Sequence, residues 1–135
     1  MIKLKTFGSF TVGNDLTFVQ EGAWRSEKLE KLFVYLAMNR NRGVCIEDIS
    51  EAIWQVEEET DNPVGALKNL AYRLRKALRD ASFDEECIVS VRGGLYKWND
   101  DVEVTIDVEE FDRYINEAEM SLFIASITHL LKASR

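Results

Sequence analysis

The chain has 135 residues, of which 46% are hydrophobic, and this supports one compact domain with an apolar core. Charged residues make up 30% and aromatic residues 10%, which excludes an intrinsically disordered chain. No apolar run approaches the ~20 residues that a membrane-spanning helix needs. Residues 1–5 carry charges where a signal peptide has its apolar stretch. We therefore expect a cytoplasmic protein that contacts no membrane.

The net charge of −7 disfavours a nucleic-acid partner, but the charges are segregated along the chain. Residues 62–98 carry seven basic and four acidic side chains, which is a local charge of +3. Acidic residues concentrate in the segments 57–61 and 100–119. The basic stretch is thus a local feature of an acidic protein, as a binding face requires.

Short strands are predicted at the start of the chain. Apolar and polar residues alternate in Ile2–Phe7, and turn residues separate this segment from Phe10–Val12 and Leu16–Val19. The three segments together predict a small antiparallel sheet.

Three helices are predicted next. Apolar spacing and an N-cap predict the first over residues 26–38, and a shorter second helix over 46–54. The third covers about 63–81 and begins with Asn62 as N-cap and Pro63 in the first turn.

The third helix has two unlike faces. Its apolar residues recur every three or four positions and predict one buried stripe. This stripe consists of Leu67, Leu70, Ala71, Leu74 and Leu78. The opposite face carries Asn69, Tyr72, Arg73 and Lys76. Lys68, Arg75 and Arg79 flank that face.

A β-hairpin is predicted after the third helix. Its strands are Ile88–Val91 and Leu95–Trp98, and Gly93 and Gly94 can supply the positive φ that a tight turn needs. Arg92 at the tip can reach the minor groove of DNA beside the third helix.

The composition changes after Trp98. Val102–Ile106 is a predicted strand, and Val108–Ala118 and Met120–Leu131 are predicted helices. These helices can pack back on the first domain or pair with another copy. We expect a first domain over residues 1–100 and the start of a helical segment over 101–135.

The order of elements predicts an α+β fold. It is a winged helix-turn-helix with an N-terminal antiparallel β-sheet, a three-helix core and a C-terminal β-hairpin wing, followed by one or two extra helices. Lysine and arginine can contact phosphate or guanine, asparagine can pair with adenine, and tyrosine can contact phosphate or a thymine methyl. A basic amphipathic helix alone is more often a solvated face, but its position before an arginine-tipped hairpin favours DNA binding. The predicted DNA-binding residues are Lys68, Asn69, Tyr72, Arg73, Arg75, Lys76, Arg79 and Arg92.

Several segments resemble one family. Asn69–Leu78 resembles the third helix of OmpR/PhoB-type winged-helix domains, in which Arg-Leu-Arg-Lys-x-Leu is typical. Val91–Trp98 is similar to the wing of that family, and Ile49–Trp54 to its second helix. Phe7–Val12 resembles the SARP/AfsR branch, in which such a domain precedes a helical bacterial transcriptional activation domain. Val104–Glu119 resembles the start of that second domain.

The resemblance covers about residues 1–119 and implies a sequence-specific transcription regulator. It implies that the third helix lies in the major groove, that Arg92 enters the minor groove, and that two copies bind tandem promoter repeats. The loop before the third helix contacts RNA polymerase in this family. Here that loop is Gln55–Asp61, and its four acids in seven residues favour a protein partner. Two positions depart from the pattern: Leu70 stands where many members have histidine, and Gly94-Leu95 replaces x-Gly in the wing.

An enzyme is disfavoured by the residue inventory. His129 is the only histidine, so no Cys/His nucleophile or multi-histidine metal site can be built around it. Cys45 and Cys87 have no metal-type spacing and are expected to be plain thiols. We expect no catalytic residues, no metal and no cofactor.

A winged helix that docks proteins through its acidic surfaces, without binding DNA, is the alternative. Such a module tolerates apolar residues at positions 69, 72, 73 and 76, where this chain has Asn, Tyr, Arg and Lys.

Overall fold

The computed structural model describes residues 1–54 and 62–133. The helices follow the caps and periodicity of the sequence, and the strands follow its alternating segments. The strands are β1 (Ile2–Lys5), β2 (Thr11–Gly13), β3 (Phe18–Val19), β4 (Ile88–Val91), β5 (Leu95–Trp98) and β6 (Val104–Ile106). The helices are α1 (Glu27–Met38), α2 (Ile46–Ile53), α3 (Pro63–Asp80) and α4 (Asp107–Ala133).

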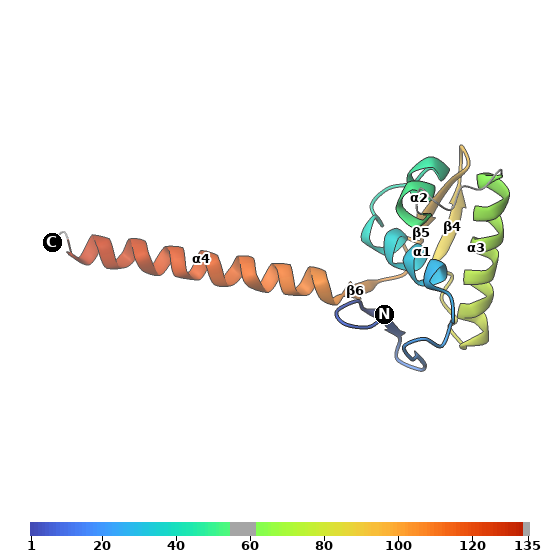
Figure 1. Cartoon of the computed structure of the whole chain (residues 1–135). Coiled ribbons are helices and arrows are strands. Elements are labelled where there is room, and N and C mark those ends of the chain that lie inside the picture. Colours follow the sequence, from blue (N-terminus) through green and yellow to red (C-terminus); the bar gives the residue numbers. More distant parts are fainter. Residues whose placement is uncertain (55–61, 134–135) are drawn as a thin grey trace.

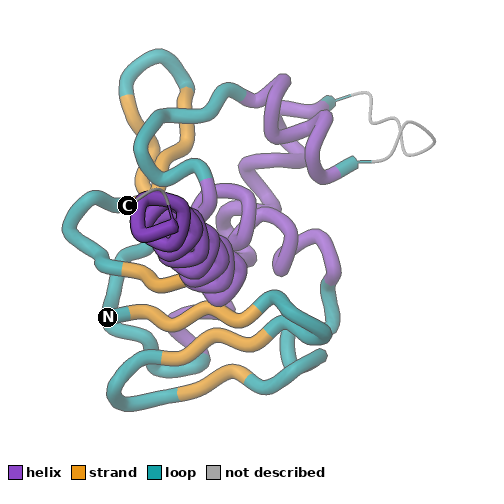
Figure 2. The backbone as a smooth tube through the Cα atoms, turned by 90° about the vertical axis from the view of Figure 1, so that its left-hand side faces the viewer, coloured by secondary structure: helices purple, strands orange, loops and turns teal. Residues whose placement is uncertain are grey.

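The N-terminal sheet has four strands in the order β3-β2-β1-β6. The three predicted strands pair antiparallel, as expected. β6 adds a parallel edge, with Ile2 opposite Val104 and Leu4 opposite Ile106. The sheet is therefore mixed, because the chain returns to β1 only after passing through all three helices and the hairpin (Figure 2).

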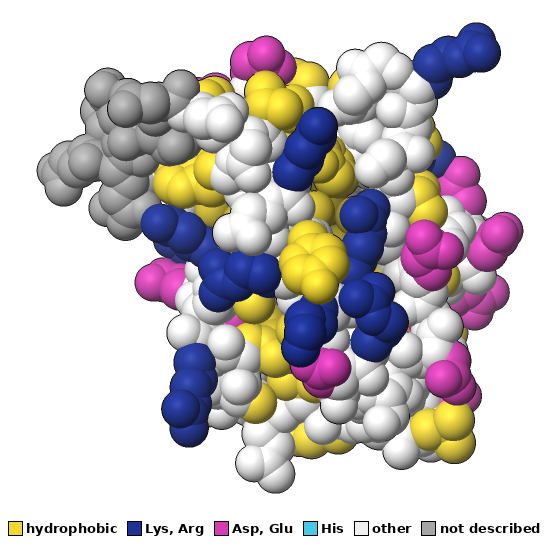
Figure 3. Space-filling model, turned by 90° about the vertical axis from the view of Figure 1, so that its right-hand side faces the viewer, with side chains coloured by type: hydrophobic (Ala, Val, Ile, Leu, Met, Phe, Trp, Pro, Cys, Tyr) yellow, Lys and Arg dark blue, Asp and Glu magenta, His cyan; other side chains and the backbone are white. Residues whose placement is uncertain are grey.

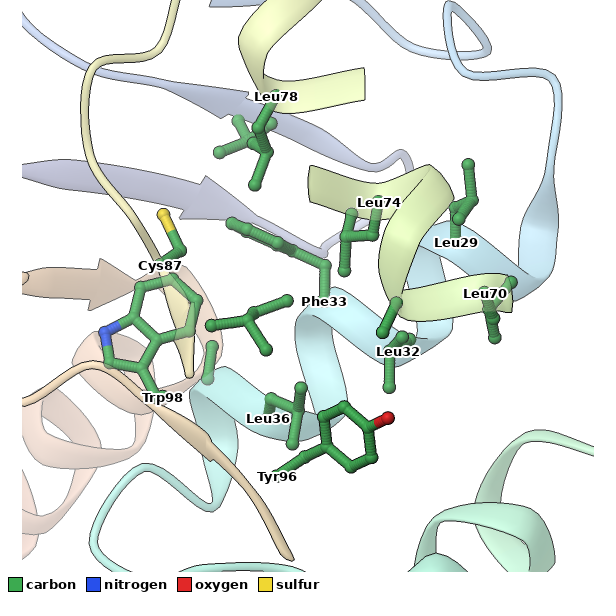
Figure 4. Close-up of a cluster of buried hydrophobic side chains, with 14 of the residues drawn as sticks. Leu29, Leu32, Phe33, Leu36, Leu70, Leu74, Leu78, Cys87, Tyr96 and Trp98 are labelled. Atoms are coloured by element: carbon green, nitrogen blue, oxygen red, sulfur yellow. The ribbon is translucent and has the colours of Figure 1, made fainter. Parts of the chain in front are cut away.

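The helices pack around an aromatic and leucine core. Phe33 of α1 is fully buried, and its ring lies 5.2 Å from that of Trp98 and 5.7 Å from that of Trp24. Figure 4 shows Leu70, Leu74 and other α3 leucines against the residues of α1. All five residues of the predicted α3 stripe are buried. Each fully buried leucine contributes roughly 1.5–3 kcal/mol, so this contact fixes the rotation of α3 about its axis.

The hairpin β4–β5 has the predicted bounds, and its register places Ile88 opposite Trp98 and Val91 opposite Leu95. Gly93 and Gly94 both have positive φ, at 88° and 74°, as the sequence predicted. Val44 exchanges backbone hydrogen bonds with Tyr96 at 2.7 and 3.0 Å, which ties the hairpin to the segment before α2. The wing is thus held beside the helical core.

The C-terminal segment forms one helix, α4, which agrees with the expected one or two extra helices and joins the two predicted helical segments. Ala118, Glu119 and Met120 lie within the helix, since no glycine, proline or capping residue separates the two predicted parts. α4 projects away from the rest of the molecule (Figure 1). None of the helices in the described part of the chain has the length and apolarity needed to cross a membrane. The expected division between residues 100 and 101 stays a prediction.

The first turn of α4 is attached to the body of the protein. The carboxylate of Asp107 accepts hydrogen bonds from the backbone N–H groups of Thr6 and Phe7 at 2.9–3.0 Å and from the Thr6 hydroxyl at 2.8 Å. Arg40 donates to both oxygens of Glu109 at 2.9 and 2.7 Å. These contacts fix the direction in which α4 leaves the sheet.

Low pH should weaken the attachment of the first turn of α4 to the segment at Thr6 and Phe7. Burial raises the pKa of Asp107, but the hydrogen bonds from Phe7, Thr6 and Val108 outweigh it and hold the pKa below its ordinary value. A lowered pKa contributes stability that is present above the unfolded value, about 3.9, and is lost as the pH falls through the folded value. Urea unfolding of Asp107→Asn should therefore show a smaller loss of stability below about pH 4 than the wild type. Asp101→Asn, at an exposed aspartate, is the control, and equal acid dependence of all three proteins would contradict the assignment.

Candidate nucleic-acid interface

The outward face of α3 is a continuous exposed surface. Six of the predicted DNA-binding residues on this helix are exposed, and Tyr72 keeps 59% of its area accessible. Figure 3 looks onto this face, where lysine and arginine side chains gather. The six are Lys68, Asn69, Tyr72, Arg73, Lys76 and Arg79.

The start of α3 is fixed by its cap. The Asn62 side chain accepts a hydrogen bond from the Gly65 N–H at 3.1 Å, and Pro63 occupies the first turn. An asparagine N-cap stabilises a helix by about 1 kcal/mol. The predicted N-terminus is thus confirmed, and it sets which residues fall on each face.

The end of α3 is fixed by a turn that the sequence did not reveal. Ser82 has a φ of 66°, its N–H donates to Arg79 O at 2.9 Å, and the Phe83 N–H donates to Leu78 O at 3.0 Å. This is the hydrogen-bond pattern that commonly ends a helix, usually with glycine at the left-handed position. Buried Phe83 then directs the chain toward β4.

Arg75 differs from the other bases of α3. It is half-buried, its Nη2 donates to Ile88 O at 3.4 Å, and its buried Nε has no partner among the described residues. The side chain therefore lies against β4. Its predicted DNA contact stays a prediction, and the structure gives Arg75 a role in joining α3 to the wing.

Lys76 has an intramolecular partner. Its Nζ lies 3.0 Å from Asp80 Oδ2, one helical turn along α3, and both side chains are more than half exposed, at 57% and 65%. An exposed pair of this spacing contributes only about 0.3–0.5 kcal/mol. The spacing of four residues was visible in the sequence, although the prediction did not use it.

Arg92 lies at the exposed tip of the hairpin, between Val91 and the two turn glycines. The other hairpin base, Lys97, is engaged elsewhere, with its Nζ 2.6 Å from Asp100 Oδ2. The tip of the wing therefore presents one guanidinium group to solvent, as the sequence predicted. Leu70, at the position where the sequence departs from the resembled family, is 4% exposed and belongs to the core.

Among the residues that the structure describes, the remaining reactive side chains do not gather into a second site. Burial, with a smaller effect of Glu85, raises the pKa of Cys87 to about 12, so this thiol stays protonated at neutral pH. Within the described residues, no three His, Cys, Asp or Glu side chains gather as a metal site would require. The loop Gln55–Asp61 and the side chain of His129 lie outside what the structure describes.

The sequence matches one family model. The family described as "Transcriptional regulatory protein, C terminal" matches residues 21–98, which is more than half of the chain and runs from just before α1 to the end of β5. No curated protein matches the chain.

A solved structure shares the fold. It is Mycobacterium tuberculosis EmbR in complex with a low affinity phosphopeptide, with a TM-score of 0.56 and 22% sequence identity. The match covers 73% of this chain and 25% of the EmbR chain, so this chain spans about a quarter of the length of that protein. The likeness is one of fold, and it agrees with the winged helix-turn-helix architecture described above.

Substitutions of Arg73 and Arg75 in α3 should differ in their effect on stability. Arg75→Ala should lower the free energy of unfolding by about 1–2 kcal/mol, because the stem loses its packing and Ile88 O loses a donor. Arg73→Ala, at an exposed position, should change it by less than about 0.5 kcal/mol. Urea titration of both variants measures the difference, and equal effects would refute the distinction between them.

Proposed function

Because the chain belongs to the OmpR/PhoB-type family of transcriptional regulatory DNA-binding domains, we propose that it binds specific DNA sequences with α3 in the major groove and Arg92 in the minor groove. The family is a class of DNA-binding regulators and not of enzymes. The opening strands resemble those of the SARP/AfsR branch, and we propose that the chain belongs to it.

One observation carries the proposal: the burial of the α3 stripe leaves the polar and basic face of the same helix exposed beside the wing. The major groove of B-DNA admits an α-helix, and residues on its outward face then reach the base edges. One face of α3 is thus buried in the core, and the opposite face is exposed to solvent.

The exposed side chains divide by chemistry. Asn69 suits adenine, Arg73 suits guanine, and Tyr72 suits a phosphate or a thymine methyl. Lys68, Lys76 and Arg79 suit phosphates, which supply affinity without sequence choice. A good bidentate base contact discriminates by about 1–3 kcal/mol, so Asn69 and Arg73 carry most of the proposed specificity.

The partners beyond one DNA duplex are also proposals. The family resemblance suggests that two copies bind tandem promoter repeats and form a homodimer on DNA. It also suggests that the loop Gln55–Asp61 contacts RNA polymerase. The acidic loop favours a protein over DNA, because carboxylates repel phosphates.

Selection from a genomic fragment library at two salt concentrations tests the function. We expect enriched sequences and an affinity that falls steeply with salt. Arg73→Ala should relax the selected sequence, whereas Lys68→Ala should weaken binding to all sequences and reduce the salt slope by about one. Arg92→Ala should reduce the preference for sites with a narrow minor groove. Absence of any enriched sequence would favour the alternative, a winged helix that docks proteins.

The Lys76–Asp80 pair offers a second test. Asp80→Asn frees Lys76 and removes one acid near DNA, so it should tighten binding several-fold at low salt. Asp84→Asn removes an equal charge from an exposed aspartate outside α3 and is the matched control. In a Lys76→Ala background the gain from Asp80→Asn should shrink, because only the removal of an acid near DNA then contributes. A gain of the same size in both backgrounds would show that Asp80 does not act through Lys76.

A further inference from the structure

The turn between β2 and β3 contacts the end of α3 through two side chains. The Thr17 hydroxyl donates a hydrogen bond to the carbonyl oxygen of Ala81, the C-cap residue of α3, at 2.7 Å. The Asn14 amide donates to both carboxylate oxygens of Glu85 at 2.9 Å. Figure 1 shows the blue N-terminal segment beside the lower end of α3. The N-terminal sheet thus touches the helix that carries most of the proposed DNA contacts.

This turn is held in shape by its own hydrogen bonds. Asn14 Oδ1 accepts from the backbone N–H groups of Leu16 and Thr17 at 2.9 and 2.8 Å, and the Asn14 N–H donates to Thr17 O at 3.0 Å. Asparagine commonly shapes a turn by bonding the backbone that follows it. At the base of the turn Val12 pairs with Val19, and both are buried in the core. The sheet therefore fixes the position of the two side chains that reach α3.

The end of α3 is weakly specified by the helix itself. The last carbonyl groups of a helix have no partner within it, and a glycine at the left-handed position commonly ends the helix. Here that position is occupied by Ser82, at a φ of 66° that serine adopts rarely. Arg79 and Asp80 follow Leu78, the last residue of the buried stripe, and both are exposed. The contacts from the sheet therefore supplement the core at the turn that carries Arg79.

We propose that Asn14 and Thr17 are positioning residues for DNA binding, because they hold the last turn of α3, and with it Arg79, against the N-terminal sheet. The inference rests on the proposed function, in which Arg79 contacts a phosphate. Asn14 and Thr17 act through the backbone of residues 81–85 and not by contact with DNA. The planar guanidinium group binds phosphate in a fixed geometry, so a shift of the helix end weakens that contact.

Backbone relaxation measured by nuclear magnetic resonance on the full chain, without DNA, tests whether the sheet holds the helix end. Thr17→Val nearly keeps the size of the side chain but removes the hydroxyl donor. The order parameters of Ser82 and Phe83 should then fall from about 0.85 toward about 0.6, while that of Leu74 stays unchanged. Thr17→Ser keeps a hydroxyl and should restore them. Thr11→Val, the same change on the neighbouring strand, is the matched control, and unchanged values at Ser82 and Phe83 in Thr17→Val would overturn the proposal.

The contact between Asn14 and Glu85 can be tested by exchanging its donor and acceptor. Asn14→Asp keeps the oxygen that shapes the turn, but it removes the amide donor and places two carboxylates together. It should therefore lower the order parameters of residues 82–83 in the same measurement. Adding Glu85→Gln supplies an amide donor to the new carboxylate and should restore them. Failure of the second change to restore the values would contradict a direct role of this contact.

Double-mutant cycles on DNA affinity test the consequence for Arg79. Thr17→Val should weaken binding to a selected duplex, and the loss of affinity caused by Arg79→Ala should be at least about twofold smaller in that background than in the wild type. Lys68→Ala, near the start of α3, should have the same effect in both backgrounds. Equal effects of Arg79→Ala in both would overturn the positioning role. If no sequence binds, the proposed function fails, and the relaxation measurement still decides whether the sheet holds the end of α3.

Discussion

The packing of α3 leucines against α1 is the contact on which the proposed function depends. Leu67, Leu70, Leu74 and Leu78 are each at most 4% exposed, and they meet the core around Phe33. A helix rotated by one residue would turn its faces by ~100° and bury charge. The hydrophobic core thereby determines which side chains of α3 are exposed for the proposed contact with DNA.

The sequence alone predicted the correct structure wherever local preferences and tertiary packing agree. The caps at Ser26 and Asn62 and the periodicity that follows them gave the helix starts, and the observed cap bonds confirm both. The buried stripe and the exposed face of α3 followed from the same period. The family match over residues 21–98 agrees with the motifs of α2, α3 and the wing. How the exposed residues divide between bases and phosphates stays a prediction, because it depends on a ligand.

The structure differs from the sequence-based predictions where contacts between distant parts of the chain decide the conformation. The place of β6 beside β1 depends on strands about a hundred residues apart, and no local pattern specifies a parallel pairing. Ser82 ends α3 at a positive φ that serine adopts rarely, so the burial of Phe83 must stabilise that turn. Arg75 lies on the margin of the outward face, and only the position of β4 shows that it turns toward Ile88. α4 continues because nothing in the sequence interrupts it.

Nuclear magnetic resonance of the labelled chain, titrated with a duplex from the library selection, tests the central claim most directly. We expect the largest changes in chemical shift at Asn69, Tyr72 and Arg73 and at the wing around Arg92. The buried stripe of α3 and the exposed part of α4 should change little. Dominant changes on α4 or on the N-terminal sheet, with the outward face of α3 unchanged, would contradict the claim that core packing presents this face to DNA.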